Sequence, residues 1–143
     1  MSDEDPPDGD VTTDDADEGS RALEAGGPID GQVLLLAGAK ASVAPTRLPD
    51  LVERAAAHLR ERRDRYRRDY ERVHADGERT VYLVDEGHWE TVGAALGFDD
   101  RETDAVRRVH EEQLRRIGRR TGRRAEFDHA LDIREAVVLG PTD

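Results

Sequence analysis

Residues 48–75 read LPDLVERAAAHLRERRDRYRRDYERVHA, and this stretch decides how the rest of the chain can pack. Its apolar side chains recur at steps of three and four, which is the spacing of one face of an α-helix. The series has one gap, at Arg62 and Arg63, and its members are Leu48, Val52, Ala55, Leu59, Tyr66, Tyr70 and Val73. Pro49 suits a first helical turn, where the N–H that it lacks has no partner. The pattern predicts one long amphipathic helix that ends before Asp76-Gly77.

The polar face of this expected helix is rich in arginine. Between Arg60 and Arg72 there are seven arginines and four acidic residues. One interpretation is a ridge that tracks phosphate groups, with nucleic acid as the ligand. The other is a solvated, ion-paired face, and molar salt favours it because salt weakens the attraction between arginine and phosphate. The basic side chains that share the ridge are Arg60, Arg63, Arg67 and His74.

Capping and turn residues divide the chain on either side of this stretch. Asp30 is placed to cap a helix that ends near Ser42. Asp99 and Glu102 form a capping-box pair that opens a helix to about Thr121, closed by Gly122. The other expected elements are a strand at 80–84, a helix at 86–96 capped by Asp85, a helix at about 124–135, and a segment 136–140 that either continues that helix or forms a strand beside 80–84.

We therefore expect a mainly α fold. It is a small helical bundle around the long helix 48–75, with at most a short two-stranded pairing of 80–84 with 136–139. The helical domain spans residues 29–140. Residues 1–28 are expected to form a disordered acidic tail, because their Asp, Gly, Pro, Ser and Thr cannot repay the entropy of ordering. Residues 1–20 carry nine acids and no base, whereas the other 123 residues hold 24 acids against 22 bases.

The composition indicates a salt-adapted protein of the cytoplasm. Of the 22 basic residues only Lys40 is a lysine, and hydrated carboxylates keep a protein dispersed in concentrated salt. The chain has no cysteine, which excludes disulfides and thiolate metal sites. Its N-terminus has no apolar core of a signal peptide. The longest apolar run, Val33–Ala39, has seven residues, far fewer than the roughly 20 that a membrane helix needs, so we expect no membrane contact.

Two places invite a ligand-site hypothesis. Asp85-Glu86-Gly87-His88-Trp89 brings carboxylates, an imidazole and the single tryptophan to a strand-to-helix corner, where helix N-terminal amides suit a ligand. His110 falls on the apolar stripe of its helix and needs a partner, since burying it unsatisfied costs about 1–3 kcal/mol. We name Asp85, His88, Trp89 and His110 as candidate ligand-binding residues. The alternatives remain open: Asp85 and Trp89 as cap and staple, and His110 as a hydrogen-bonded core residue.

Catalytic and metal motifs fail on spacing. His110-Glu111-Glu112-Gln113-Leu114 begins like HExxH, but Leu114 replaces the second histidine. Gly38-Ala39-Lys40-Ala41-Ser42 lacks the adjacency that a phosphate loop requires. Ser42 is the single serine after residue 28, which argues against a serine triad. We expect no enzyme activity, no catalytic residue, no metal site and no cofactor.

The stretch Trp89–Arg108, WETVGAALGFDDRETDAVRR, is similar to a helix-turn-helix. Thr103 stands where an aliphatic residue is usual, and the second helix is longer than most recognition helices. Its outward residues are mixed in sign and lack the amides typical of base readout. If residues 86–121 bind DNA, the nucleic-acid-binding residues are Arg107, Arg108 and Arg115.

Five short motifs of the chain are informative together: Ala39-Lys40-Ala41-Ser42, Arg47-Leu48-Pro49, Gly87-His88-Trp89, His110-Glu111-Glu112-Gln113 and the run Ala130-Leu131-Asp132-Ile133-Arg134-Glu135-Ala136-Val137. On these motifs, residues 30–140 resemble a family of small haloarchaeal proteins known only as a domain of unknown function. The resemblance implies a haloarchaeal, cytoplasmic source and gives no residue a role.

The leading functional prediction is a non-enzymatic helical interaction or regulatory module of a salt-adapted cytoplasm. Its partner would be another protein or a second copy bound through helix 48–75, beside the Tyr66/Tyr70 pair. The alternative is a DNA-binding regulator that uses residues 86–121. The third hypothesis is a metal or small-ligand site near Asp85 and His88. A broken 48–75 helix whose arginines meet the histidines at one hollow would favour a binding pocket instead.

Overall fold

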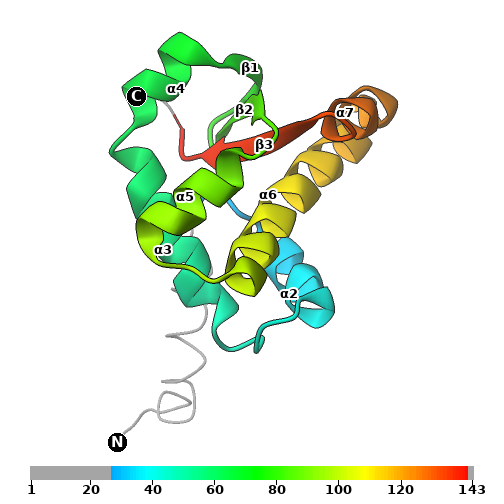
Figure 1. Ribbon diagram of the computed structural model, residues 1–143. Coiled ribbons are helices and arrows are strands. Elements are labelled where there is room, and N and C mark those ends of the chain that lie inside the picture. Colours follow the sequence, from blue (N-terminus) through cyan, green and yellow to red (C-terminus); the bar gives the residue numbers. More distant parts are fainter. Residues whose placement is uncertain (1–26, 142–143) are drawn as a thin grey trace, which may run out of the picture.

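The computed structural model describes residues 27–141 as a mainly α domain with a small three-stranded antiparallel sheet (Figure 1). The expected acidic tail lies outside the described residues apart from Gly27 and Pro28, and the buried Pro28 belongs to the folded domain. The elements in chain order are α2 (Gly31–Lys40), α3 (Leu48–Arg60), α4 (Arg63–Asp69), β1 (Glu71–Ala75), β2 (Thr80–Asp85), α5 (His88–Leu96), α6 (Asp100–Thr121), α7 (Arg124–Leu131) and β3 (Arg134–Leu139).

The prediction of one helix over 48–75 is wrong. α3 stops at Arg60, and Arg62 leaves the helical region with φ −113° and ψ 18°. The chain then forms the short helix α4 and, from Glu71, the edge strand β1. The break falls at the gap in the apolar series, where no side chain is available to bury. Because the chain bends there, the ring of Tyr66 packs near that of Tyr82 on β2, with ring centroids 6.1 Å apart. Contact with the sheet therefore stabilises the bent chain more than a continued helix would.

The sheet has the order β1-β2-β3. The expected pairing of the segment after 80 with the C-terminal segment is confirmed, because β2 and β3 pair antiparallel from Thr80↔Leu139 to Asp85↔Arg134. The last helix is shorter than expected for the same reason: it ends at Leu131 so that β3 can begin at Arg134. β1 was not expected. Val73 is its single large apolar residue, and pairing with β2 holds the strand at the sheet edge.

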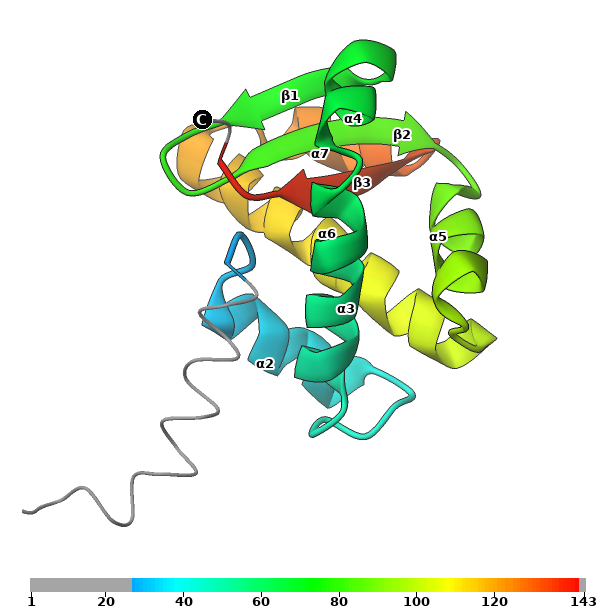
Figure 2. The ribbon, with the colours of Figure 1, turned by 90° about the vertical axis from the view of Figure 1, so that its left-hand side faces the viewer.

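Helices cover both faces of the sheet. In Figure 2, α3 and α4 lie in front of it, α6 and α7 lie behind it, and α5 lies at one end. α6 is the long helix of the domain, and it packs against α2, α3, α5, α7 and β3. Its capping box is confirmed, since Asp99 accepts from the Glu102 backbone and Glu102 accepts from the Asp99 backbone. Gly97 and Gly122 end α5 and α6 in the left-handed conformation, as their type favours.

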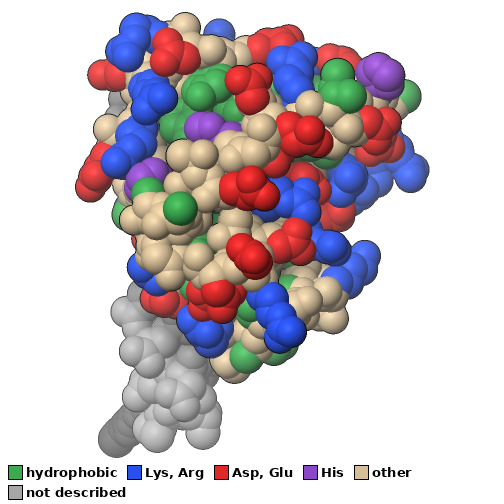
Figure 3. Space-filling view, viewed as in Figure 1, with side chains coloured by type: hydrophobic (Ala, Val, Ile, Leu, Met, Phe, Trp, Pro, Cys, Tyr) green, Lys and Arg blue, Asp and Glu red, His purple; other side chains and the backbone are tan. Residues whose placement is uncertain are grey.

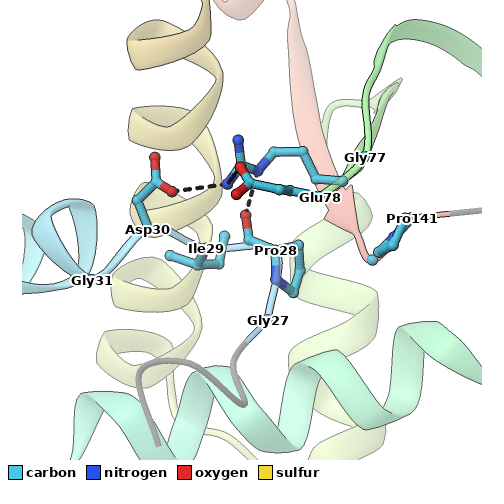
Figure 4. Close-up of a pocket in the computed structure, with 10 residues that line it drawn as sticks. Gly27, Pro28, Ile29, Asp30, Gly31, Gly77, Glu78 and Pro141 are labelled. Carbon is cyan, nitrogen blue, oxygen red and sulfur yellow. Dashed lines mark hydrogen bonds and ion pairs between the residues drawn. The ribbon is translucent and has the colours of Figure 1, made fainter. Parts of the chain in front are cut away.

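Asp30 occupies the position before α2, but its carboxylate has a different role from the expected cap. It accepts a hydrogen bond from the buried guanidinium of Arg79 at 2.8 Å, and Arg79 also donates to the carbonyl of Pro28 at 2.7 Å (Figure 4). Gln113 of α6 donates to the same carboxylate and accepts from the Asp30 backbone N–H. Pro28, Asp30 and Arg79 line a hollow of about 580 Å³. The bonds tie the start of the domain to the β1–β2 turn and to α6. We assign this cluster a structural role, because the guanidinium is already paired.

Candidate ligand pocket between α3, α4 and α5

The bend after α3 opens a hollow of about 330 Å³ against α5. One wall follows a single ridge of α3 and α4, and the other follows a single ridge of α5, as the spacing of helical faces requires. Over these helices the surface shows histidine side chains among hydrophobic ones, with lysine or arginine side chains along the neighbouring edge (Figure 3). The lining residues are His58, Arg62, Arg65, Tyr66, Tyr70, His88, Thr91, Val92 and Ala95.

Three aromatic side chains form the inner part of the hollow. The hydroxyl of the buried Tyr66 lies 2.5 Å from Nε2 of His88. The His88 ring stands edge-on to Tyr66 and to Tyr70, with ring centroids 5.4 Å apart in both cases. Burial raises the pKa of Tyr66 and lowers the pKa of His88 below its usual value of 6.5, so both groups are neutral near pH 7. One proton therefore lies between the two side chains.

The outer part of the hollow is cationic. Arg62 donates to the carbonyl of His58 at 2.9 Å, and its nearest acidic oxygen, on Glu61, is 3.7 Å away. Arg65 lies 3.7 Å from a carboxylate oxygen of Asp69. Both guanidinium groups are partly exposed, so these loose pairs hold them weakly. Among the described residues, none that lines this hollow is an aspartate or a glutamate.

The start of α5 is held by a residue that sequence reasoning missed. Glu135 of β3 accepts from the backbone N–H groups of Gly87 and Trp89, both at 2.9 Å. Gly87, with φ +93°, is the residue before the helix, so the prediction that Asp85 caps it is wrong. Asp85 is instead exposed at the end of β2, opposite Arg134. Glu135 lies 46 residues from Trp89 in the sequence, so no local sequence signal predicts this capping contact.

Comparison with known families finds one whose model covers the described part of the chain. A family described as a domain of unknown function (DUF8048) matches residues 27–141. The chain belongs to the DUF8048 family. The match confirms the resemblance to a family of unknown function that the sequence indicated. No curated protein and no solved structure is significantly similar to the chain.

Of the four ligand-binding candidates in this DUF8048 domain, only His88 lines the hollow. Trp89 is buried on the other side of α5 and donates its indole N–H to the carbonyl of Ala136 at 2.9 Å. It contributes to a second hollow of about 340 Å³, whose walls include the carboxylates of Glu90 and Asp104. Within residues 27–141, no group of three or more histidines and acids could hold a metal ion.

His110 is a buried core residue. Its Nδ1 accepts a hydrogen bond from the backbone N–H of Val138 at 3.0 Å, and its ring centroid lies 4.5 Å from that of Trp89. Burial lowers the pKa of His110 to about 3. The neutral imidazole thus joins α6 to β3. Of the two interpretations that the sequence left open, this contact agrees with a hydrogen-bonded core residue.

The three arginines named for DNA binding lie on α6 beside carboxylates. Arg107 pairs with Asp104 and with Glu111, and Arg108 pairs with Asp104 at 2.8 Å. Arg115 pairs with Glu112 at 2.9 Å. Because these three arginines are already paired and α6 is packed on several sides, they offer little free positive charge to a DNA groove. DNA binding by the DUF8048 domain stays a prediction that these contacts do not favour.

Self-association also stays a prediction, but the segment 48–75 does not offer the exposed apolar face that was expected to mediate it. The apolar side chains of α3 are buried in the core of the same domain, as are those of Tyr66 and β2. On α2, Leu35 and Leu36 are 68% and 55% exposed.

No helix of the described part of the chain is both long enough and apolar enough to cross a membrane.

Sequence reasoning found His88 but not the residues around it. His58, Arg62, Arg65 and Tyr66 were assigned to one straight helix, and nothing in the sequence showed that α5 would pack beside this face. The gap at Arg62 and Arg63 was the available signal, and it coincides with the bend that forms the hollow.

Proposed function

We propose that this domain is a non-catalytic binding module that takes up a small anionic molecule in the hollow between α3, α4 and α5. The observation that carries the proposal is the chemistry of the lining: two arginines, two histidines, two tyrosines and a threonine, without a carboxylate among the described residues that form it. Residues 27–141 hold 22 acids and 21 bases, so a hollow lined by two arginines and no acid departs from the near balance of the domain.

The size and position of the hollow suit such a ligand. A volume of about 330 Å³ lies at the lower end of the roughly 300–1,000 Å³ typical of small-molecule sites. Guanidinium groups hold carboxylates, sulfonates and phosphates through paired N–H donors. Salt screens partly buried charges less than exposed ones, so the half-buried Arg62 keeps more of its attraction for a ligand in molar salt than an arginine on the outer face would.

The protein is expected to work in a particular cellular environment. We infer a salt-adapted cytoplasm from the scarcity of lysine and the nine acids in residues 1–20, and a haloarchaeal source from the family resemblance of the sequence. In that setting the module would act as a regulator, with the bound anion as its signal.

Calorimetry on the full chain in molar KCl tests the proposal with two probes of nearly equal shape. Benzenesulfonate carries a permanent negative charge, whereas benzenesulfonamide is neutral at pH 7. We expect benzenesulfonate to bind and benzenesulfonamide to bind at least about tenfold more weakly, since one lost charged contact is worth about 1.4 kcal/mol or more.

Matched variants locate the site. Arg65→Gln removes a guanidinium that lines the hollow, and Arg68→Gln removes an exposed one from the same helix outside it. Both variants change the net charge equally. We expect the affinity for benzenesulfonate to fall about tenfold in Arg65→Gln and to stay unchanged in Arg68→Gln. Equal affinities of the two variants, or no binding by the unmodified chain, would overturn the proposal.

A further inference from the structure

The pair formed by Tyr66 and His88 gives the hollow a feature that arginines alone would not supply. The hydroxyl and Nε2 are 2.5 Å apart, and with both groups neutral a single proton joins them. In this state at least one of the two polar atoms acts as an acceptor, and an acceptor repels an anion. In the free protein, this acceptor atom therefore weakens the binding of an anion in the hollow.

Protonation of the imidazole removes this conflict. An imidazolium has two N–H donors and no acceptor. Its Nε2–H must then donate to the oxygen of Tyr66, since that oxygen is its hydrogen-bond partner at 2.5 Å. Where the neutral imidazole carries its hydrogen on Nδ1, the Tyr66 hydroxyl is the donor in the pair, and protonation releases its hydrogen to rotate about the C–O bond toward another acceptor. One proton from solvent thus adds a positive charge in either tautomer, and in this tautomer it also turns the tyrosine hydroxyl into a free donor.

Burial is the largest influence against protonation of His88, and the charged groups around the imidazole act in addition to it. Two carboxylates favour the charged form and the nearby basic groups oppose it. An anion in the hollow adds a negative charge where the described lining residues supply none. The titratable and charged groups that face the imidazole are Arg65, Tyr66 and Tyr70 on α4 and at its end, His58 on α3, Asp85 on β2 and Glu135 on β3.

We propose that anion binding in this hollow is coupled to the uptake of one proton by His88, and that the Tyr66 hydroxyl turns its O–H toward the bound anion. This inference rests on the proposed function and specifies its regulation. The ligand is held more tightly at lower pH, so the module reports the anion together with the acidity of its surroundings.

The direction of the pH dependence follows from the linkage between the two equilibria. Burial keeps the pKa of free His88 below 6.5, and a bound anion raises it. Affinity is then highest below the pKa of the free protein. Between the free and the bound pKa it falls by up to about tenfold per pH unit, which is the limit for one linked proton. Above the bound pKa it is constant.

NMR of the full chain tests the coupling at the imidazole itself. The ring C–H signal of His88 is followed from pH 5 to pH 8, with and without saturating benzenesulfonate, whose charge does not change in this range. We expect the pKa of His88 to rise when the probe is bound. His129, exposed on α7 and outside the hollow, serves as the control in the same spectra and should not respond.

A variant tests the part assigned to the hydroxyl. Tyr66→Phe keeps the buried ring and removes the oxygen that accepts from the imidazolium. Its affinity for benzenesulfonate should therefore gain less on acidification than that of the parent chain, because only the charge attraction to the imidazolium remains. His129→Gln should retain the parent's dependence on pH in full. Binding of benzenesulfonate with an unchanged His88 pKa would overturn the coupling and leave the proposed function intact, whereas absence of binding at every pH would overturn both.

Discussion

Buried His110 makes the stability of the domain depend on pH in a calculable way. Its pKa is about 3 in the folded chain, against the usual 6.5. In the folded state the neutral imidazole accepts from Val138 and stays unprotonated, whereas in the unfolded chain it takes up a proton as the pH falls below 6.5. Protonation therefore favours unfolding throughout this interval. The free energy of unfolding falls by about 1.4 kcal/mol per pH unit, or about 2 kcal/mol between pH 6.5 and about pH 5.

The variant His110→Asn removes the titrating group and keeps an acceptor, because Oδ1 of asparagine can take the place of Nδ1. Loss of ring contacts with Trp89 should cost about 2–3 kcal/mol at pH 7. Urea unfolding of both proteins, followed by circular dichroism at pH 7 and about pH 5, separates the two effects, since distant carboxylates contribute equally to both. We expect the difference between the proteins to shrink by about 2 kcal/mol on acidification. A difference that is the same at both pH values would refute a neutral, structural His110.

Three further substitutions test the packing, each by urea unfolding. Gly93→Ala should destabilise the domain by about 1–3 kcal/mol, because an added Cβ would overlap the Thr103 hydroxyl. Adding Thr103→Ala should recover much of the lost stability. A Gly93→Ala variant as stable as the parent would contradict this close crossing of α5 and α6. Asp99→Ala should cost about 1 kcal/mol through loss of the capping box, and an unchanged midpoint would argue against it. Arg79→Met should cost about 1–3 kcal/mol through loss of the hydrogen bonds from the buried guanidinium to Pro28 and Asp30, although Asp30 keeps Arg116 as a partner. A variant as stable as the parent would show that these bonds are dispensable.

Local signals in the sequence predicted local structure well. Gly97 and Gly122 end helices, and Asp99 with Glu102 opens one, because each depends only on residues within one helical turn. The apolar run after Thr80 gave β2, and the ambiguity over Ala136–Gly140 was resolved by pairing with it. Such features are set by neighbours along the chain or by a long apolar run, and both can be read from the sequence.

Features that depend on distant partners could not be predicted in the same way. Tyr66, Tyr70 and Val73 keep helical spacing, yet the chain bends at Arg62 and turns into β1 because contacts with β2 stabilise that arrangement more. Asp85 had the position of a cap, but Glu135 fills that role across the sheet. His88 was identified as a candidate from its own segment. Its surroundings were not, because they arise from the bend.

The central claim is that the hollow between α3, α4 and α5 binds an anion, and an amide NMR titration of the full chain with benzenesulfonate in molar KCl tests it most directly. We predict saturable shifts at residues such as Tyr66, Thr91 and Val92, which line the hollow, and none of comparable size with benzenesulfonamide. Shifts that gather instead around the hollow beside Asp30 and Arg79, or spectra that do not change at all, would contradict it.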